Sequence, residues 1–172
     1  IKKSKKKCGY IYAEHQTNGR GTYGKKWVSN KGNLFGTIFF QLKNNYPPFN
    51  EFSIINALLV SDVIKFFCNK KKISLKFPND IFISSKKICG ILQELITVNE
   101  KNFLIIGIGI NTVSNPLIKE SYKATNILFE TQKEPKIVDI INLLISSYEK
   151  FFQELSLYNY TNYKKKAELM AI

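Results

Sequence analysis

The chain has a single arginine, Arg20, among its 26 lysine and arginine residues. Lysine serves elsewhere in this chain wherever a positive charge suffices, so Arg20 marks a place that requires a flat, forked and permanently charged guanidinium group. The only histidine and the only tryptophan, His15 and Trp27, lie in the same short stretch. Together these residues single out segment 15–27 as a candidate site for an anion.

Glycines flank this arginine at Gly19, Gly21 and Gly24. Glycine lets backbone amides approach an anion closely, while the basic side chains of the segment add positive charge. Glycine-rich loops are often plain turns, and neither a Walker pattern nor a Rossmann fingerprint is present here. Arg20 and the length of the loop, which runs to about Gly32, favour a functional loop over a simple turn.

A second segment combines a turn motif with charged and apolar residues. It begins with Lys76-Phe77-Pro78-Asn79-Asp80 and continues with Lys86-Lys87-Ile88-Cys89-Gly90-Ile91-Leu92-Gln93-Glu94. Pro-Asn-Asp is typical of a turn between two strands, and that reading leaves the lysines solvated. Gly90 interrupts an otherwise apolar strand, however, and glycine in a strand often marks the close approach of a ligand or another backbone.

A third segment, Gly107-Ile108-Gly109-Ile110-Asn111, ends an apolar strand with a polar side chain. Glycines two residues apart clear the same face of a sheet, which gives room for a ligand. The spacing fits a β-bulge or tight helix packing equally well.

The elements that must position these segments follow from apolar periodicity. Alternation and turn signals predict strands at 8–14, 34–42, 73–77, 81–83, 87–97 and 102–110. Apolar residues at three- and four-residue steps predict helices at 49–67 and 136–155. Four strands in a row predict a meander. Strands with singly interspersed helices predict an α+β fold, in which helices pack on a mixed β-sheet.

The formal net charge of +13 permits a nucleic-acid-binding module, with lysines grouped at 2–7, 70–72 and 164–166. The excess of lysine, isoleucine and asparagine over the whole chain favours compositional drift instead. The apolar stretches are too short to span a membrane. Three cysteines without a paired spacing indicate reduced thiols. We therefore expect a soluble, cytoplasmic protein without a metal site or a membrane partner.

The three segments, in this order, resemble the signatures of the biotin–protein ligase family: a Gly-Arg-Gly loop ending near a Trp, a Lys-Trp-Pro-Asn-Asp turn with a downstream Lys and Gly, and a Gly-x-Gly-Ile-Asn strand. The resemblance spans about residues 8–163. It implies a mixed sheet flanked by helices, similar to the catalytic domain of class II aminoacyl-tRNA synthetases. It also implies that biotin and ATP, accompanied by Mg²⁺, form biotinyl-5′-adenylate, from which a lysine of a biotin carboxyl carrier protein accepts the biotinyl group.

The resemblance assigns roles to individual residues. It makes Arg20, Lys87 and Asp80 the catalytic residues, because joining a carboxylate to a polyphosphate requires fixed positive charge. It places Gln16, Gly19, Arg20, Gly21, Lys87 and Gly90 around biotin. It places Trp27, Asn79 and Asn111 at ATP. We also expect Ile88, Ile91 and Leu92 to supply an apolar wall.

The sequence departs from the family pattern at two positions. Thr22 stands where many members carry a second loop arginine, which predicts weaker retention of the adenylate, and Phe77 replaces the usual Trp. We expect a catalytic domain over residues 1–163 that lacks its N-terminal edge. We expect residues 164–172 to be a tail that leads to an absent C-terminal β-barrel domain. A homodimer is compatible with the family.

Three other functions remain open from the sequence. A lipoate or octanoate ligase shares the fold and the adenylating chemistry, although its arginine and glycine signature is missing here. A lysine-rich nucleic-acid-binding module would bind DNA with a steep salt dependence. A biotin sensor without catalytic activity is the third alternative.

Overall fold

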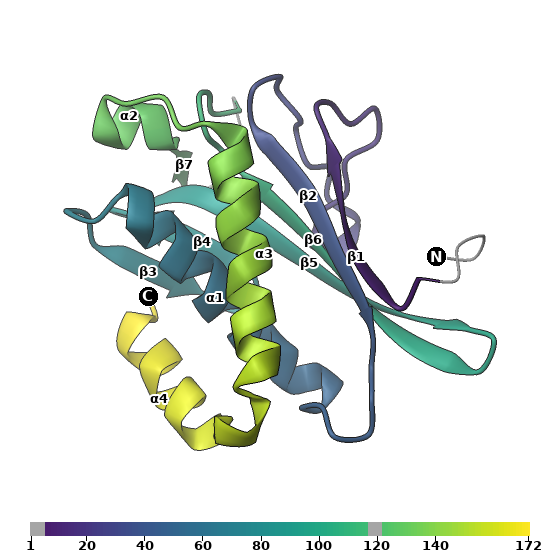
Figure 1. The fold of residues 1–172 in the computed structure, drawn as a ribbon. Coiled ribbons are helices and arrows are strands. Elements are labelled where there is room, and N and C mark those ends of the chain that lie inside the picture. Colours follow the sequence, from purple (N-terminus) through teal and green to yellow (C-terminus); the bar gives the residue numbers. More distant parts are fainter. Residues whose placement is uncertain (1–5, 117–121) are drawn as a thin grey trace.

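One mixed sheet organises the computed structural model, which describes residues 6–116 and 122–172 (Figure 1). Its strands are β1 (Cys8–Ala13), β2 (Leu34–Gln41), β3 (Ile73–Lys76), β4 (Asp80–Ile83), β5 (Lys86–Val98), β6 (Lys101–Ile110) and β7 (Lys123–Ala124). The order is β1-β2-β6-β5-β4-β3, and β7 pairs with β5. Strand β7 runs parallel to β5, whereas the other paired strands are antiparallel. The predicted meander and mixed sheet are confirmed.

Alternation along the strands separates the two faces of the sheet. In β6, Leu104, Ile106, Ile108 and Ile110 belong to the main hydrophobic core, while the intervening glycines Gly107 and Gly109 point the other way. The same alternation in β5 places Gly90, Leu92 and Glu94 on the glycine face. One face is therefore built for packing, and the other is left with little side-chain bulk near its centre.

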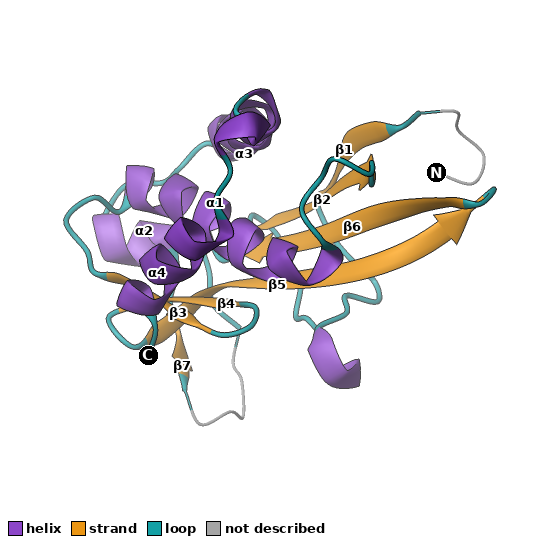
Figure 2. Ribbon diagram, turned by 90° about the horizontal axis from the view of Figure 1, so that it is seen from below, coloured by secondary structure: helices purple, strands orange, loops and turns teal. Residues whose placement is uncertain are grey.

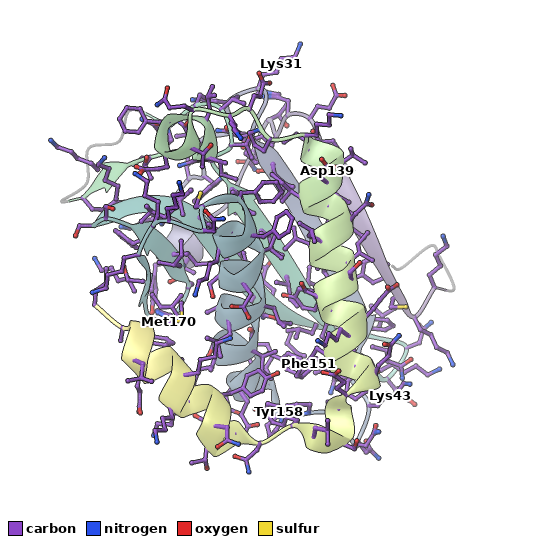
Figure 3. All side chains as sticks on the ribbon, turned by 60° about the vertical axis from the view of Figure 1, so that its left-hand side comes forward. Lys31, Lys43, Asp139, Phe151, Tyr158 and Met170 are labelled. Atoms are coloured by element: carbon purple, nitrogen blue, oxygen red, sulfur yellow. The ribbon has the colours of Figure 1, made fainter. Side chains whose placement is uncertain are left out.

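The α-helices cover the apolar face of the sheet (Figure 2). They are α1 (Phe52–Phe67), α2 (Ile127–Thr131), α3 (Ile137–Gln153) and α4 (Tyr160–Met170), with a 3₁₀ turn at Phe49–Glu51 ahead of α1. Helix α3 buries Ile140, Leu144, Tyr148 and Phe151, which recur at helical spacing. Phe151 and Tyr158 lie together where α3 gives way to α4 (Figure 3), with ring centroids 5.9 Å apart.

Both predicted helices and all six predicted strands are present, with ends that shift by a few residues. Sequence reasoning missed β7, α2 and α4. Helix α4 buries Ala167, and Ala171 pairs with Leu75 of β3. The expected boundary between residues 163 and 164 thus falls inside a helix that packs on the core, while a further β-barrel domain stays a prediction. The lysine group at 2–7 lies outside the described residues except for Lys6 and Lys7.

No helix in residues 6–116 and 122–172 is both long and apolar enough to cross a membrane.

Candidate functional site

A cavity of about 530 Å³ lies on the glycine face of the sheet, between the β1–β2 loop and the ends of β5 and β6. Its lining includes every residue that the sequence analysis assigned to catalysis, biotin or ATP: Gln16, Gly19, Arg20, Gly21, Trp27, Asn79, Asp80, Lys87, Gly90 and Asn111. The fold therefore gathers three segments that are far apart in the sequence around one hollow. Their individual roles stay predictions.

The loop between β1 and β2 folds back on itself to form the outer wall of the cavity. The Trp27 amide donates to the Gly19 carbonyl at 2.9 Å, and Arg20 forms an antiparallel bridge with Lys26. A side chain at Gly19 would place its Cβ 2.5 Å from the carbonyl oxygen of Trp27, so this position requires glycine. The loop is thus an ordered wall, held by its own backbone.

The indole ring of Trp27 lies on the floor of the cavity, over Gly90 and Gly109. These glycines are direct partners across β5 and β6. A Cβ at Gly90 would lie 2.6 Å from the Trp27 ring, and one at Gly109 would lie 2.5 Å from it. A Cβ at Gly107 would meet only Leu92, at 3.6 Å or more. Trp27 therefore makes the close approach that the sequence predicted at Gly90, and it fills the cleared face that the sequence predicted at Gly109.

The Lys87 ammonium lies at the inner end of the cavity. Its Nζ is 2.7 Å from Oδ2 of Asp80, and the side chains of Lys87 and Asp80 are 15% and 14% exposed. The rings of Trp27 and Tyr122 lie around the same nitrogen, with centroids at 5.5 Å and 5.3 Å. Lys87 is thus a fixed and partly desolvated positive charge, which interacts more strongly with an anion than an exposed lysine does.

Two buried polar atoms of this site have no hydrogen-bond partner within the described residues: Oδ1 of Asp80 and the indole Nε1 of Trp27. Buried polar atoms in native proteins are nearly always paired, so an unpaired acceptor and an unpaired donor in one cavity fit a site that a ligand completes. Burial raises the pKa of the nearby Cys89 thiol far above its usual range, and the Asp80 charge adds to this effect. Cys89 is therefore a neutral core residue and no nucleophile.

The two asparagines of the site are held by different means. Asn79 donates from Nδ2 to the Thr22 hydroxyl at 3.4 Å, which connects the turn before β4 to the loop. Asn111 is 2% exposed, and its Nδ2 donates to the backbone carbonyl of Thr125 at 3.0 Å. Asn79 therefore remains adjustable, whereas Asn111 is fixed from behind.

Arg20 points along the mouth of the cavity toward Glu94. Its Nη2 donates to Oε2 of Glu94 at 2.7 Å, and the side chains are 64% and 36% exposed. In this structure the guanidinium of the predicted anion loop is thus paired with a carboxylate of β5. Such an exposed pair is weak, so another anion can replace Glu94.

Sequence reasoning missed two residues of the site and misplaced one. Glu94 could have been found, because it lies two and four residues beyond Leu92 and Gly90 on the same face of β5. Tyr122, whose hydroxyl lies 3.4 Å from Lys87 Nζ, precedes a strand that gave no sequence signal. Ile88 is fully buried in the core beneath the helices and is not part of the cavity wall, unlike Ile91 and Leu92.

Within the part of the chain that the structure describes, no group of three or more His, Cys, Asp or Glu residues could hold a metal ion.

Residues 2–111 match the model of the biotin/lipoate A/B protein ligase family. The chain is 33% identical over 101 residues to the bifunctional ligase/repressor BirA of Escherichia coli, covering 58% of this chain and 31% of that protein. It is 28% identical over 109 residues to the biotin–[acetyl-CoA-carboxylase] ligase of Paracoccus denitrificans, covering 62% and 45%. The chain thus spans less than half the length of these relatives.

Solved structures agree with this similarity over nearly the whole chain. The biotin protein ligase of Aquifex aeolicus, in complex with biotin and ATP, superposes with a TM-score of 0.78 at 27% identity, over 95% of this chain and 68% of that one. The biotin protein ligase of Leishmania major, in complex with biotin, has a TM-score of 0.84 over 96% of this chain and 72% of its own, at 24% identity. The predicted fold class is confirmed.

Proposed function

This chain belongs to the biotin/lipoate A/B protein ligase family, and we propose that it adenylates biotin with ATP and transfers the biotinyl group to a biotin carboxyl carrier protein. A carboxylate oxygen of biotin attacks the α-phosphorus of ATP, which enters as its Mg²⁺ complex, and pyrophosphate leaves. The amine of an acceptor lysine then attacks the acyl carbon, AMP leaves, and the lysine nitrogen loses a proton.

The observation that carries this proposal is the environment of Lys87. Its ammonium is held by Asp80 at 2.7 Å, in the lining of a cavity of about 530 Å³. Bringing a carboxylate to a phosphate sets two anions against each other, so a preorganised cation between them lowers the barrier. We assign to Lys87 the contact with biotin's carboxylate and with the α-phosphate.

The remaining roles follow from position around that cation. Arg20 lies in the outer wall, where its guanidinium would meet the phosphate. Gln16, Gly19, Gly21 and Gly90 would line the biotin pocket. Asp80 orients Lys87 and keeps Oδ1 free as an acceptor, which suits it to position the acceptor lysine.

The nucleotide would lie along Trp27, Asn79 and Asn111. The Trp27 ring lies over the paired glycines Gly90 and Gly109, and its Nε1 is unpaired within the described residues. Biotin would displace the indole from the floor of the cavity, and adenine would then stack on the indole. Closure of the loop would then exclude water from the adenylate, which is a hydrolysable anhydride.

The Paracoccus denitrificans relative and the two solved structures named above are biotin ligases by name, and the comparisons favour neither a lipoate ligase nor a nucleic-acid-binding module. We infer a cytoplasmic location because the reaction uses ATP and all three cysteines are free thiols. A homodimer stays a prediction.

The proposal is tested by incubating the protein with biotin, Mg-ATP and an unbiotinylated carrier domain, and then measuring the mass of the carrier. One added biotinyl group, dependent on both substrates, supports the proposed function. A carrier of unchanged mass, with no biotinyl-adenylate in the mixture, rejects it.

A further inference from the structure

Behind the cavity, outside its lining, lies a carboxylate that the proposed chemistry does not use. Glu130 is in the short helix α2, and its side chain is only 4% exposed. Its oxygens face three donors from three parts of the chain: the Thr125 hydroxyl at 2.7 Å, Lys71 Nζ at 3.3 Å and Lys86 Nζ at 3.5 Å. A buried carboxylate with this many partners is a fixed point in the structure.

Thr125 connects this carboxylate to the site. Its amide donates to the carbonyl oxygen of Lys87 at 2.9 Å, and its own carbonyl oxygen accepts from Nδ2 of Asn111 at 3.0 Å. The Ile127 amide then donates to the carbonyl oxygen of Asn111 at 3.2 Å. Segment 123–127 therefore fixes the backbone of one predicted site residue and the side chain of another.

The same carboxylate also holds β5 directly, through Lys86, which is adjacent to Lys87 in the sequence. Strand β7 has only two residues, and its register pairs Lys86 with Lys123 and Lys87 with Ala124. So short a strand has little stability of its own. Figure 1 shows α2 close to β7 at the end of the sheet where these contacts occur.

We propose that Glu130 is a positioning residue for the adenylation site: through Thr125 and Lys86 it fixes Lys87 and Asn111 without contacting substrate. This inference rests on the proposed function for its catalytic consequence. The attachment of segment 123–127 to the site is a structural claim, and it can be tested whether or not the protein is active. Loss of the Thr125–Glu130 hydrogen bond would free Thr125, and both site residues would lose a fixed partner.

Two matched pairs of variants test the proposal. Glu130→Gln keeps an acceptor oxygen for Thr125, whereas Glu130→Leu removes it; Thr125→Ser keeps the hydroxyl donor, whereas Thr125→Val removes it. Tyr148→Phe is the control for lost stability, because it deletes a buried hydrogen bond to Asn56 within the helix layer, away from the cavity. The Thr125 pair keeps the test valid if Glu130→Leu fails to fold.

The first readout is amide hydrogen exchange by NMR at Thr125 and Ile127, which requires no activity. We expect exchange at both amides to be at least about tenfold faster in Glu130→Leu and Thr125→Val than in the parent or Thr125→Ser. Glu130→Gln should lie in between, because it keeps the acceptor for Thr125 and loses the ion pair with Lys86. In Tyr148→Phe, the exchange rates of these two amides, taken relative to those of the other sheet amides, should equal the parent values. Parent-like exchange in Thr125→Val and Glu130→Leu would overturn the proposal.

The second readout is biotin-dependent exchange of pyrophosphate into ATP. Thr125→Val should lower kcat about tenfold while changing the KM for biotin less than about threefold, because the loop and Gly90 are untouched. Thr125→Ser should keep the parent kcat, and Tyr148→Phe should lower the melting temperature without changing kcat. Equal kcat values in Thr125→Val and Thr125→Ser would contradict the positioning role. If the parent chain catalyses no pyrophosphate exchange, the proposed function is rejected. The amide exchange rates would still show whether Glu130 attaches segment 123–127 to the site.

Discussion

Arg20 and Glu94 are joined by a 2.7 Å ion pair that links the β1–β2 loop to the glycine face of β5. The pair is exposed, so it contributes on the order of 0–1 kcal/mol and can be exchanged for a stronger partner. A phosphate offers the guanidinium two parallel hydrogen bonds. Glu94 thus holds Arg20 at the cavity mouth in a pair that a phosphate can displace.

Replacing Arg20 by lysine preserves the charge but removes the fork. We expect Arg20→Lys to lower the rate of adenylate formation by more than about tenfold, because one ammonium cannot replace a guanidinium on a phosphate. Pyrophosphate exchange into ATP measures this rate. Glu94→Gln serves as the control, since it removes the ion pair and leaves the guanidinium, and it should stay within about threefold of the parent. Unchanged exchange in Arg20→Lys would rule out a specific role for the guanidinium.

Neutralising Lys87 should lower both the adenylation rate and the free energy of unfolding, and a second substitution should separate the two effects. Lys87→Gln should lower adenylation at least about 100-fold, because it removes the cation between the reacting anions. It should also cost roughly 2 kcal/mol of unfolding free energy, because Asp80 is left without its partner. Adding Asp80→Asn should recover stability but not activity. If the double variant regains adenylation, the Lys87 charge is not part of the chemistry.

The contact between Trp27 and Gly109 can be followed by fluorescence, because the chain has one tryptophan. A Cβ at Gly109 would lie 2.5 Å from the indole, so Gly109→Ala should displace the ring and shift its emission to longer wavelength. Gly107→Ala is the matched control on the same strand and face, where the added Cβ has room. Identical emission spectra for the two variants would show that Trp27 does not lie on the paired glycines in solution.

Thr22 offers the loop no positive charge and instead accepts a hydrogen bond from Asn79. We predict that the adenylate leaves this site more readily than it leaves a ligase with a second loop arginine. Thr22→Arg should therefore reduce biotinylation of bystander lysines, measured by mass spectrometry on an added protein without a carrier motif. Bystander labelling that is the same in Thr22→Arg as in the parent would refute the prediction.

Much of the fold could be predicted because apolar periodicity is strong in the long elements. Helix α3 shows this best, since four of its residues at helical spacing are buried. Helices α2 and α4 were missed although each begins with an asparagine cap, Asn126 and Asn159. Asparagine is abundant throughout this chain, so its capping preference carried little information.

The site was predictable to the extent that it consists of local motifs. The glycine loop, the Pro-Asn-Asp turn and the Gly-x-Gly strand indicated which residues gather around the cavity. They could not indicate that Gly90 and Gly109 face each other under Trp27, because register is a property of the paired strands. The backbone hydrogen bonds of Thr125 to Lys87 and Asn111 were likewise hidden, since they do not depend on the type of residue at 125.

The most direct test of the account is exchange of labelled pyrophosphate into ATP by this chain, with biotin, with lipoate or with neither. We predict exchange that requires biotin, is not supported by lipoate and is abolished by Lys87→Gln. Exchange that depends on lipoate, or that persists in Lys87→Gln at the parent rate, would contradict the assignment of a biotin-adenylating site built around Lys87.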